Sequence, residues 1–282
     1  MTKLFNTSKL VPAFVFVSFY LIVASCTPDN IKEDDSLKTF FDEHKSTGTF
    51  GLYSNGTGSF NIYNLSRFAD STYTPASTFK IVNSLIGTEL GIVPNDSTVL
   101  DWGFRVSGRT ECDTPLTMRE AFRRSCPNWY QKLAQKIGVA TMQRYLDTLG
   151  YGARYKKFVI KNNLDTFWLN NDLKVTADEE LGVVKKLYFN QLPFQNRTQE
   201  LVRNMMLWED NANYKLYYKT GWGTTPSGNQ LGWIVGWIEE NKHPYFFALQ
   251  VESPDSKIDM KTVRLSILKN ILKKYGFFEG KK

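Results

Sequence analysis

The alternation of apolar and polar residues places the predicted strands near the two ends of the chain. Two runs rich in β-branched and aromatic residues, Thr47–Tyr53 and Ser59–Tyr63, flank Asn55-Gly56, a pair that favours a tight hairpin turn. Three further runs of this kind lie near the C-terminus: Tyr214–Thr220, Leu231–Ile238 and Tyr245–Glu252. Because both ends supply strands, we predict one antiparallel sheet in which the two ends of the chain meet.

Between these strands, apolar residues recur at the three-to-four-residue spacing of helices. Ser77–Leu90 is the clearest case, with Gly91 in the position of a C-terminal cap, and Thr117 with Glu120 has the spacing of a capping box. The other predicted helices are Val139–Leu149, Ala177–Phe189, Thr198–Trp208 and Met260–Tyr275. Since there is no β-α-β alternation, we predict an α+β fold: an antiparallel sheet built from both termini and flanked by helices, with a central all-helical lobe.

Composition narrows the chemistry that the chain can perform. It has 282 residues but only three cysteines and two histidines, so cysteine-cluster zinc sites are excluded and we predict no metal site. The net charge of +7 is spread out, and no Lys/Arg run alternates with aromatic residues, so we predict no nucleic-acid partner. His44 and His243 have no partner residues nearby in sequence. Catalysis would therefore depend on Ser, Lys, Tyr and carboxylate groups.

The N-terminus has the three parts of a secretory signal. Lys3 and Lys9 precede a mostly apolar run, Leu10–Ala24, that is too short to span a membrane as a helix. The run ends in Val23-Ala24-Ser25-Cys26, which resembles a bacterial lipobox, in which the cysteine is lipidated and becomes the new N-terminus. We therefore expect a lipoprotein signal peptide (1–25), a lipid-anchored linker (26–39) and a folded domain (40–282), held at the periplasmic side of a bacterial membrane only by the lipid on Cys26.

Two further cysteines, Cys112 and Cys126, are separated by 13 residues. In an oxidising compartment they could form a disulfide, which would stabilise the fold by about 3 kcal/mol. The sequence does not show whether their Cβ atoms approach each other, so free thiols are an equal alternative.

The strongest candidate for chemistry is Ser77-Thr78-Phe79-Lys80. At the start of a helix, Lys80 lies one turn after Ser77 on the same face, where an amine with a lowered pKa could take the serine proton. The helix N-terminus also directs backbone N–H groups toward developing negative charge. Ser266 and Lys269 repeat the spacing, and we interpret this second copy as the surface of the last helix.

The second candidate is Lys219-Thr220-Gly221 at the end of a predicted strand, followed by Trp222. A cation, a hydroxyl donor and a glycine at a strand edge could bind an anionic substrate laid along that edge. The motif occurs once in the chain.

Together these motifs resemble the serine penicillin-recognising enzymes, whose motifs follow the order Ser77-x-x-Lys80, Ser125, Lys219-Thr220-Gly221. The details are similar to the class D (OXA-type) serine β-lactamases over about residues 40–278. Further matching positions are Tyr151-Gly152, Phe167-Trp168-Leu169, Gly232–Trp237 and Arg264. The resemblance implies the β-lactamase/transpeptidase-like fold and hydrolysis of β-lactam antibiotics.

The resemblance also implies a role for each matching residue. Ser77 would form the acyl-enzyme, and the Ser77 and Trp222 N–H groups would form an oxyanion hole beside Gly221. Lys80 would be carboxylated by CO2, the only small molecule required, and its carbamate would act as general base. Trp168 would donate a hydrogen bond to that carbamate. Ser125, assisted by Lys219, would pass a proton to the lactam nitrogen, while Thr220 and Arg264 would bind the substrate carboxylate.

Two positions depart from the class D pattern. Ser125-Cys126-Pro127 stands where the class usually has Ser-x-Val, and Ala153 follows Tyr151-Gly152 where the class has Asn. Three alternatives therefore stay open: a penicillin-binding protein or β-lactam sensor that is acylated but deacylates slowly, a carboxypeptidase, and a non-catalytic interaction protein. Monomer and homodimer are both compatible with the sequence.

Overall fold

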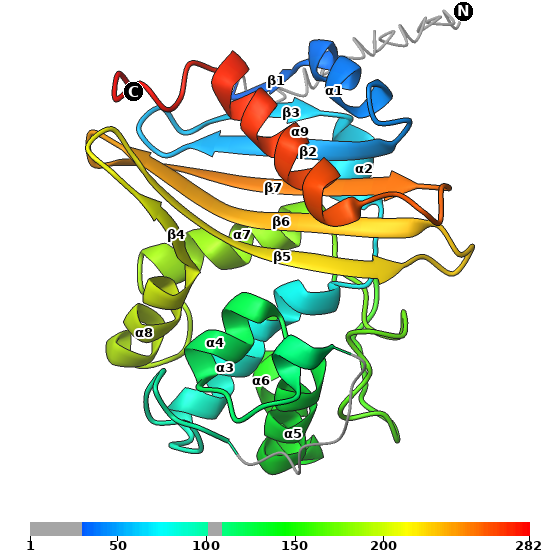
Figure 1. The fold of residues 1–282 in the computed structure, drawn as a ribbon, viewed down its shortest axis with the longest axis vertical. Coiled ribbons are helices and arrows are strands. Elements are labelled where there is room, and N and C mark those ends of the chain that lie inside the picture. Colours follow the sequence, from blue (N-terminus) through cyan, green and yellow to red (C-terminus); the bar gives the residue numbers. More distant parts are fainter. Residues whose placement is uncertain (1–29, 101–108) are drawn as a thin grey trace, which may run out of the picture.

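A single sheet organises the protein within residues 30–100 and 109–282, the parts described by this computed structural model (Figure 1). Its strand order is β1-β3-β2-β7-β6-β5-β4. The strands are β1 (Ile31–Glu33), β2 (Thr47–Ser54), β3 (Ser59–Tyr63), β4 (Leu207–Asp210), β5 (Lys215–Thr224), β6 (Gln230–Glu240) and β7 (His243–Ser253). All neighbours are antiparallel except β1 and β3. Because β2 pairs with β7, the two ends of the chain meet as predicted.

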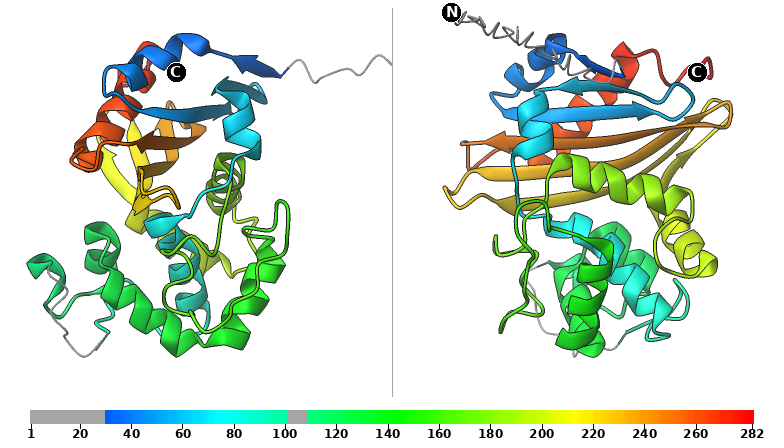
Figure 2. Two further views of the ribbon diagram at one scale, coloured as in Figure 1. Left: turned by 90° about the vertical axis from the view of Figure 1, so that its right-hand side faces the viewer. Right: turned by 180° about the vertical axis from the view of Figure 1, so that it is seen from behind.

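Helices cover both faces of this sheet and form a lobe beyond one edge (Figures 1 and 2). The helices are α1 (Lys38–Asp42), α2 (Leu65–Asp70), α3 (Lys80–Glu89), α4 (Met118–Arg124), α5 (Pro127–Ile137), α6 (Val139–Leu149), α7 (Ala177–Tyr188), α8 (Asn196–Met206) and α9 (Met260–Lys274). Helices α1 and α9 lie on one face, α2 and α7 on the other, and α3 to α6 form the lobe. The predicted α+β class and the central helical lobe are confirmed.

Strand β6 is buried along most of its length because both sheet faces are covered. Trp233, Val235 and Trp237 belong to the core shared with α7 and the helical lobe. Ile234 and Ile238 belong to the core beneath α9. A strand buried on both faces needs apolar residues on both, which explains its nearly continuous apolar sequence.

The predicted helix Thr198–Trp208 is wrong at its C-terminal end, where Leu207 begins strand β4 instead. Tertiary contacts outweigh the helical pattern there. The Trp208 indole stacks on Tyr218 of β5, with ring centroids 5.1 Å apart, and its N–H donates to the Tyr218 carbonyl at 2.9 Å. No pattern in the sequence predicted β4 or β1.

The described chain begins with structure inside the segment predicted as a linker. Ile31–Glu33 pairs in parallel with β3, a 3-10 helix (η1) spans Asp35–Leu37, and Leu37 is fully buried. The predicted signal peptide and Cys26 lie outside the described residues. None of the helices in the described part has the length and apolar character needed to cross a membrane.

Candidate active site

The proposed nucleophile lies in a strained turn where the sheet meets the helical lobe. A 3-10 helix (η2) spans Ala76–Phe79, so the predicted helix from Ser77 is split into this short helix and α3. Ala76 is buried with a positive φ of 50°, an uncommon conformation for a residue with a side chain. Strand β5 passes close to the turn. A Cβ at Gly221 would lie 2.9 Å from the Pro75 carbonyl oxygen, so only glycine fits there.

Lys80 is fully buried one turn after half-buried Ser77. Its Nζ lies in hydrogen-bond contact with Ser77 Oγ at 2.7 Å, and 5.3 Å from the centre of the Tyr130 ring. Burial, and secondarily the positive charge of Arg109, lower the pKa of Lys80 to about 7. A substantial fraction of this amine is therefore neutral near pH 7 and can accept a proton.

Ser125 and Lys219 meet on the other side of the site. Ser125 ends α4 in the left-handed conformation, with φ 59° and ψ 41°. Lys219 donates hydrogen bonds to Ser125 Oγ and to the Thr220 carbonyl, each at 2.9 Å. Burial, together with the charges of Lys80, Arg264 and Arg109, holds the pKa of Lys219 well below its usual value.

These groups give the site several basic side chains, whose amines lose part of their positive charge because burial lowers their pKa. Within the described residues, neither Lys80 nor Lys219 forms an ion pair with a carboxylate. Buried cations without a counter-ion are costly, and an anion brought into the site relieves that cost. The arrangement therefore favours a negatively charged ligand or modification.

Trp168 packs beside the residue that precedes Lys80. The indole is fully buried and stacks on Phe79, the residue directly before Lys80. Its Nε1 has no hydrogen-bond partner among the described residues. A buried N–H without a partner costs about 1–3 kcal/mol of stability, so an acceptor brought beside it would be bound favourably. A carboxylate on Lys80 would be an acceptor of that kind.

The predicted carboxylate-binding residues gather along β5. Arg264 projects from α9 and donates a hydrogen bond to the Gly221 carbonyl, while its Nε is buried and has no partner in residues 30–100 and 109–282. It reaches β5 past Gly232 of β6, where a Cβ would overlap Met260 Sδ at 2.3 Å. Burial lowers the pKa of Arg264 to about 10. Trp222 is about half exposed and donates from Nε1 to Gln230 at 2.9 Å.

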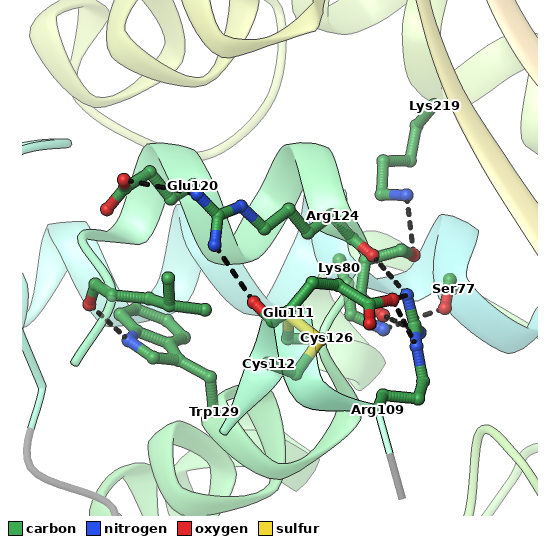
Figure 3. Close-up of a disulfide and its surroundings, with 12 residues drawn as sticks. Ser77, Lys80, Arg109, Glu111, Cys112, Glu120, Arg124, Cys126, Trp129 and Lys219 are labelled. Carbon is green, nitrogen blue, oxygen red and sulfur yellow. Dashed lines mark hydrogen bonds and ion pairs between the residues drawn. A yellow bond between two sulfur atoms is a disulfide. The ribbon is translucent and has the colours of Figure 1, made fainter. Parts of the chain in front are cut away.

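A disulfide between Cys112 and Cys126 fixes the residue next to Ser125 (Figure 3). The two Cα atoms are 5.5 Å apart, which settles the open question in favour of the disulfide. Arg109 holds the same turn, donating to the Ser125 carbonyl at 3.3 Å and the Arg124 carbonyl at 2.8 Å. Pro127 takes the first position of α5, where its fixed φ suits a helix start.

The structure adds site residues that the sequence analysis missed: Glu180, Tyr130 and Arg109. The Tyr151 hydroxyl, a matching position of the resemblance with no role assigned to it, donates a hydrogen bond to Glu180. The detectable signal was an acid within the buried stripe of α7, formed by Ala177, Glu180, Leu181 and Val184. The second Ser-x-x-Lys copy lies apart from the site, with Lys269 paired to Glu209 at 2.8 Å. No cluster of metal-binding side chains occurs among the described residues.

Comparisons with known proteins agree with this arrangement. Residues 38–273 match the family model for the penicillin binding protein transpeptidase domain. The β-lactamase OXA-48 of Klebsiella pneumoniae is 33% identical, with 92% of this chain and 95% of that protein covered. The class D β-lactamase YbXI from Nostoc superposes with a TM-score of 0.81 at 31% identity, covering 87% of this chain and 100% of that one.

A receptor also shares the fold. The C-terminal domain of the Bacillus licheniformis BlaR penicillin receptor superposes with a TM-score of 0.80 at 26% identity, covering 88% of this chain and 98% of that one. The OXA-48 and Nostoc enzymes match this chain at higher sequence identity, 33% and 31%, than the receptor domain does. The chain therefore belongs to the penicillin-binding protein transpeptidase-domain family and, within it, to the class D serine β-lactamases.

Proposed function

We propose that the protein hydrolyses β-lactams through an acyl-enzyme on Ser77. The observation that carries this proposal is the 2.7 Å contact between Ser77 Oγ and the fully buried Lys80 amine. As a proton leaves Oγ, a bond forms between Oγ and the lactam carbonyl carbon. The C–N bond of the ring then breaks. Water later attacks the ester and releases the ring-opened acid with Ser77 restored.

Lys80 is proposed to be carboxylated in the active enzyme. CO2 bound to its amine supplies a carboxylate that can act as general base. Three observations support this: the lowered Lys80 pKa, which favours the neutral amine that CO2 requires; the unpaired Trp168 Nε1; and the cationic surroundings. Trp168 would donate its N–H to that carboxylate and fix its orientation.

The remaining residues would protonate the leaving group, stabilise the oxyanion or bind the substrate. Ser125 would pass a proton to the lactam nitrogen, and Lys219, bonded to Ser125 Oγ at 2.9 Å, would lower the barrier by its charge. The backbone N–H groups of Ser77 and Trp222 would form the oxyanion hole. Thr220 and Arg264 would bind the substrate carboxylate beside Gly221, which is where Arg264 already lies.

A test follows penicillin turnover by a protein starting at residue 30. It is mixed with several equivalents of benzylpenicillin, with and without bicarbonate, and both lactam absorbance and intact mass are recorded. We expect complete hydrolysis, faster with bicarbonate, and loss of turnover in Ser77→Ala and Lys80→Ala. Ser266→Ala, from the surface Ser-x-x-Lys copy, is the matched control and should behave as wild type.

The main alternative is a receptor, and its supporting observation is the similarity to the BlaR domain. A receptor would consume one equivalent of penicillin and keep a long-lived adduct on Ser77. That outcome would overturn the hydrolase mechanism. A carboxypeptidase would instead release D-alanine from peptidoglycan stem peptides, which the same preparation can be assayed for.

We further propose that the full-length chain is anchored by lipid on Cys26 at the periplasmic side of a bacterial membrane. The lipobox-like Val23–Cys26 supports this proposal. Full-length protein should fractionate with membranes and carry a lipid mass on Cys26, whereas Cys26→Ser should not. Sedimentation of the protein starting at residue 30 would distinguish a monomer from a homodimer.

A further inference from the structure

Glu180 is a buried acid at the junction of three segments. It lies on α7, the helix packed on the sheet, and is only 1% exposed. It contacts Thr78 of the Ser77 turn and Tyr151, which follows α6. The mechanism proposed above gives this carboxyl group no role. A carboxyl group buried in the apolar stripe of a helix lowers stability unless it forms hydrogen bonds.

The contacts of Glu180 form a short chain of hydrogen bonds. Its Oε1 lies 2.8 Å from the Tyr151 hydroxyl and 2.6 Å from Thr78 Oγ1. Thr78 Oγ1 also lies 2.8 Å from the carbonyl of Pro75. The chain therefore runs from Tyr151 through Glu180 and Thr78 to the backbone of the turn that holds Ala76 at positive φ.

Counting protons along this chain indicates the state of Glu180. There are three contacts, and the hydroxyls of Tyr151 and Thr78 supply one proton each. An ionised Glu180 supplies none, so one contact would bring two acceptors together without a proton between them. A protonated Glu180 supplies the third. Tyr151 then donates to Glu180, Glu180 to Thr78, and Thr78 to the Pro75 carbonyl.

The surroundings of Glu180 agree with this count. In the described part of the chain it forms no salt bridge, and the like charge of Glu179 acts to raise its pKa. The Glu179 carboxylate is held in the capping box of α7 by the Thr176 backbone N–H at 2.8 Å. Burial raises the pKa of Glu180 to about 7, against the lowering effect of the two hydroxyls.

We propose that Glu180 is a positioning residue that works as a neutral acid and holds the Ser77 turn by donating its proton to Thr78. When Glu180 loses that proton, Thr78 has one hydrogen for two acceptors, and its bond to Pro75 or to Glu180 is lost. The strained turn then loosens and Ser77 leaves its position beside Lys80. Acylation by β-lactams therefore falls as Glu180 ionises. This inference rests on the proposed role of Ser77.

The first experiment compares acylation rates of wild type and Glu180→Gln in the full-length chain across pH. The Gln amide keeps an N–H for Thr78 at every pH but cannot ionise. Lys80 titrates in both proteins, so the ratio of the two rates isolates Glu180. We expect wild type to lose about tenfold relative to Glu180→Gln at one pH unit above the pKa of Glu180. A ratio that stays constant with pH would overturn the proposal.

The second experiment needs no catalysis. Because the pKa of Glu180 is raised on folding, from 4.5 to about 7, the folded state binds more protons in that window. Wild-type stability should therefore fall, relative to Glu180→Gln, as pH rises from 4.5 through 7. The Tm of wild type minus the Tm of Glu180→Gln should become more negative over that range and then stay constant. The exposed Glu200→Gln is the matched control for the change of a carboxyl group to an amide on the surface.

Infrared spectra separate the remaining outcomes. Wild type should show the C=O band of a buried protonated carboxyl group that is absent in Glu180→Gln and disappears as pH rises through 7. Absence of this band would overturn the neutral-acid assignment. If the band and the Tm effect are present but the rate ratio is flat, Glu180 is protonated without positioning Ser77. Since neither readout uses turnover, both hold even if Ser77→Ala leaves hydrolysis intact.

Discussion

The indole of Trp168 stacks on the ring of Phe79, the residue that precedes Lys80, with centroids 5.1 Å apart and planes inclined by 26°. The Trp168 Nε1 has no hydrogen-bond partner among the described residues. Trp237 offers an internal comparison. Its Nε1 is also buried and has no partner in the part of the chain that the structure describes, but the Trp237 ring stacks on Tyr217 within the sheet.

We predict that Trp168→Phe keeps the packing and loses the hydrogen bond to carboxylated Lys80. A hydrogen bond to a charged group contributes about 1.5–3 kcal/mol, so the bicarbonate concentration for half-maximal activity should rise by about tenfold to a hundredfold. Carbon-13 NMR with labelled bicarbonate would measure carbamate occupancy directly. Trp237→Phe should leave both readings at the wild-type value; an equal shift in the two variants would contradict the assignment.

Lys219 is predicted to act through Ser125. Lys219→Ala removes the donor to Ser125 Oγ, and kcat/KM for benzylpenicillin should fall by about 10²–10⁴, the range for loss of a positioned proton-transfer group. Lys215→Ala is the control on the same strand, because Lys215 is surface-exposed and pairs with Asp210 at 3.1 Å. Comparable losses in both variants would indicate a general effect on β5.

The Cys112–Cys126 disulfide is predicted to stabilise the fold by about 3 kcal/mol, as expected for a loop of this length. Urea unfolding with and without reductant measures this difference, and the Cys112→Ser/Cys126→Ser double variant checks it. Because Cys126 follows Ser125, reduction should also lower kcat. Unchanged kcat in the stable fraction would show that the contacts of Arg109 and Lys219 keep Ser125 in place without the disulfide.

Lys80 is predicted to destabilise the fold at neutral and acid pH. Its pKa is lowered on folding from 10.5 to about 7, so the unfolded state binds more protons between those values. Lys80→Met should therefore be more stable than wild type, by up to about 5 kcal/mol at pH 7 and below. That gain should shrink as pH rises toward 10.5. Urea unfolding in bicarbonate-free buffer tests this, with exposed Lys186→Met as control.

Most of the fold could be predicted because its signals are local. The hairpin of β2 and β3 follows from alternation and Asn55-Gly56, and the capping box at Thr117 forms as expected. Strand β4 could not be predicted, because what ends the helix at Leu207 is the contact of Trp208 with Tyr218, a residue of another strand. The parallel β1 is three residues long, too short for any periodic pattern.

In the active site, too, the residues joined by local spacing could be predicted, and those joined by tertiary contacts could not. Ser77 and Lys80 are three residues apart in the sequence, so their proximity could be predicted although η2 and α3 divide them, and the motif order linked them to Ser125 and Lys219. The disulfide could not be decided, because it depends on the distance between two Cα atoms in separate segments. Glu180 and Arg109 escaped notice because each acts through backbone or hydroxyl groups that tertiary structure brings to it.

The pairing of β2 with β7 has a consequence for how the molecule is made. Strand β2 can pair with β3 early, but its second neighbour, β7, is complete only when Ser253 has been synthesised, and Arg264 reaches Gly221 only once α9 exists. The Ser77 turn is thus synthesised early, but the contacts that complete its site form last. Long-range closure of this kind slows folding. A growing chain that already contains Ser77 should therefore not react with β-lactams until almost its whole length has been synthesised.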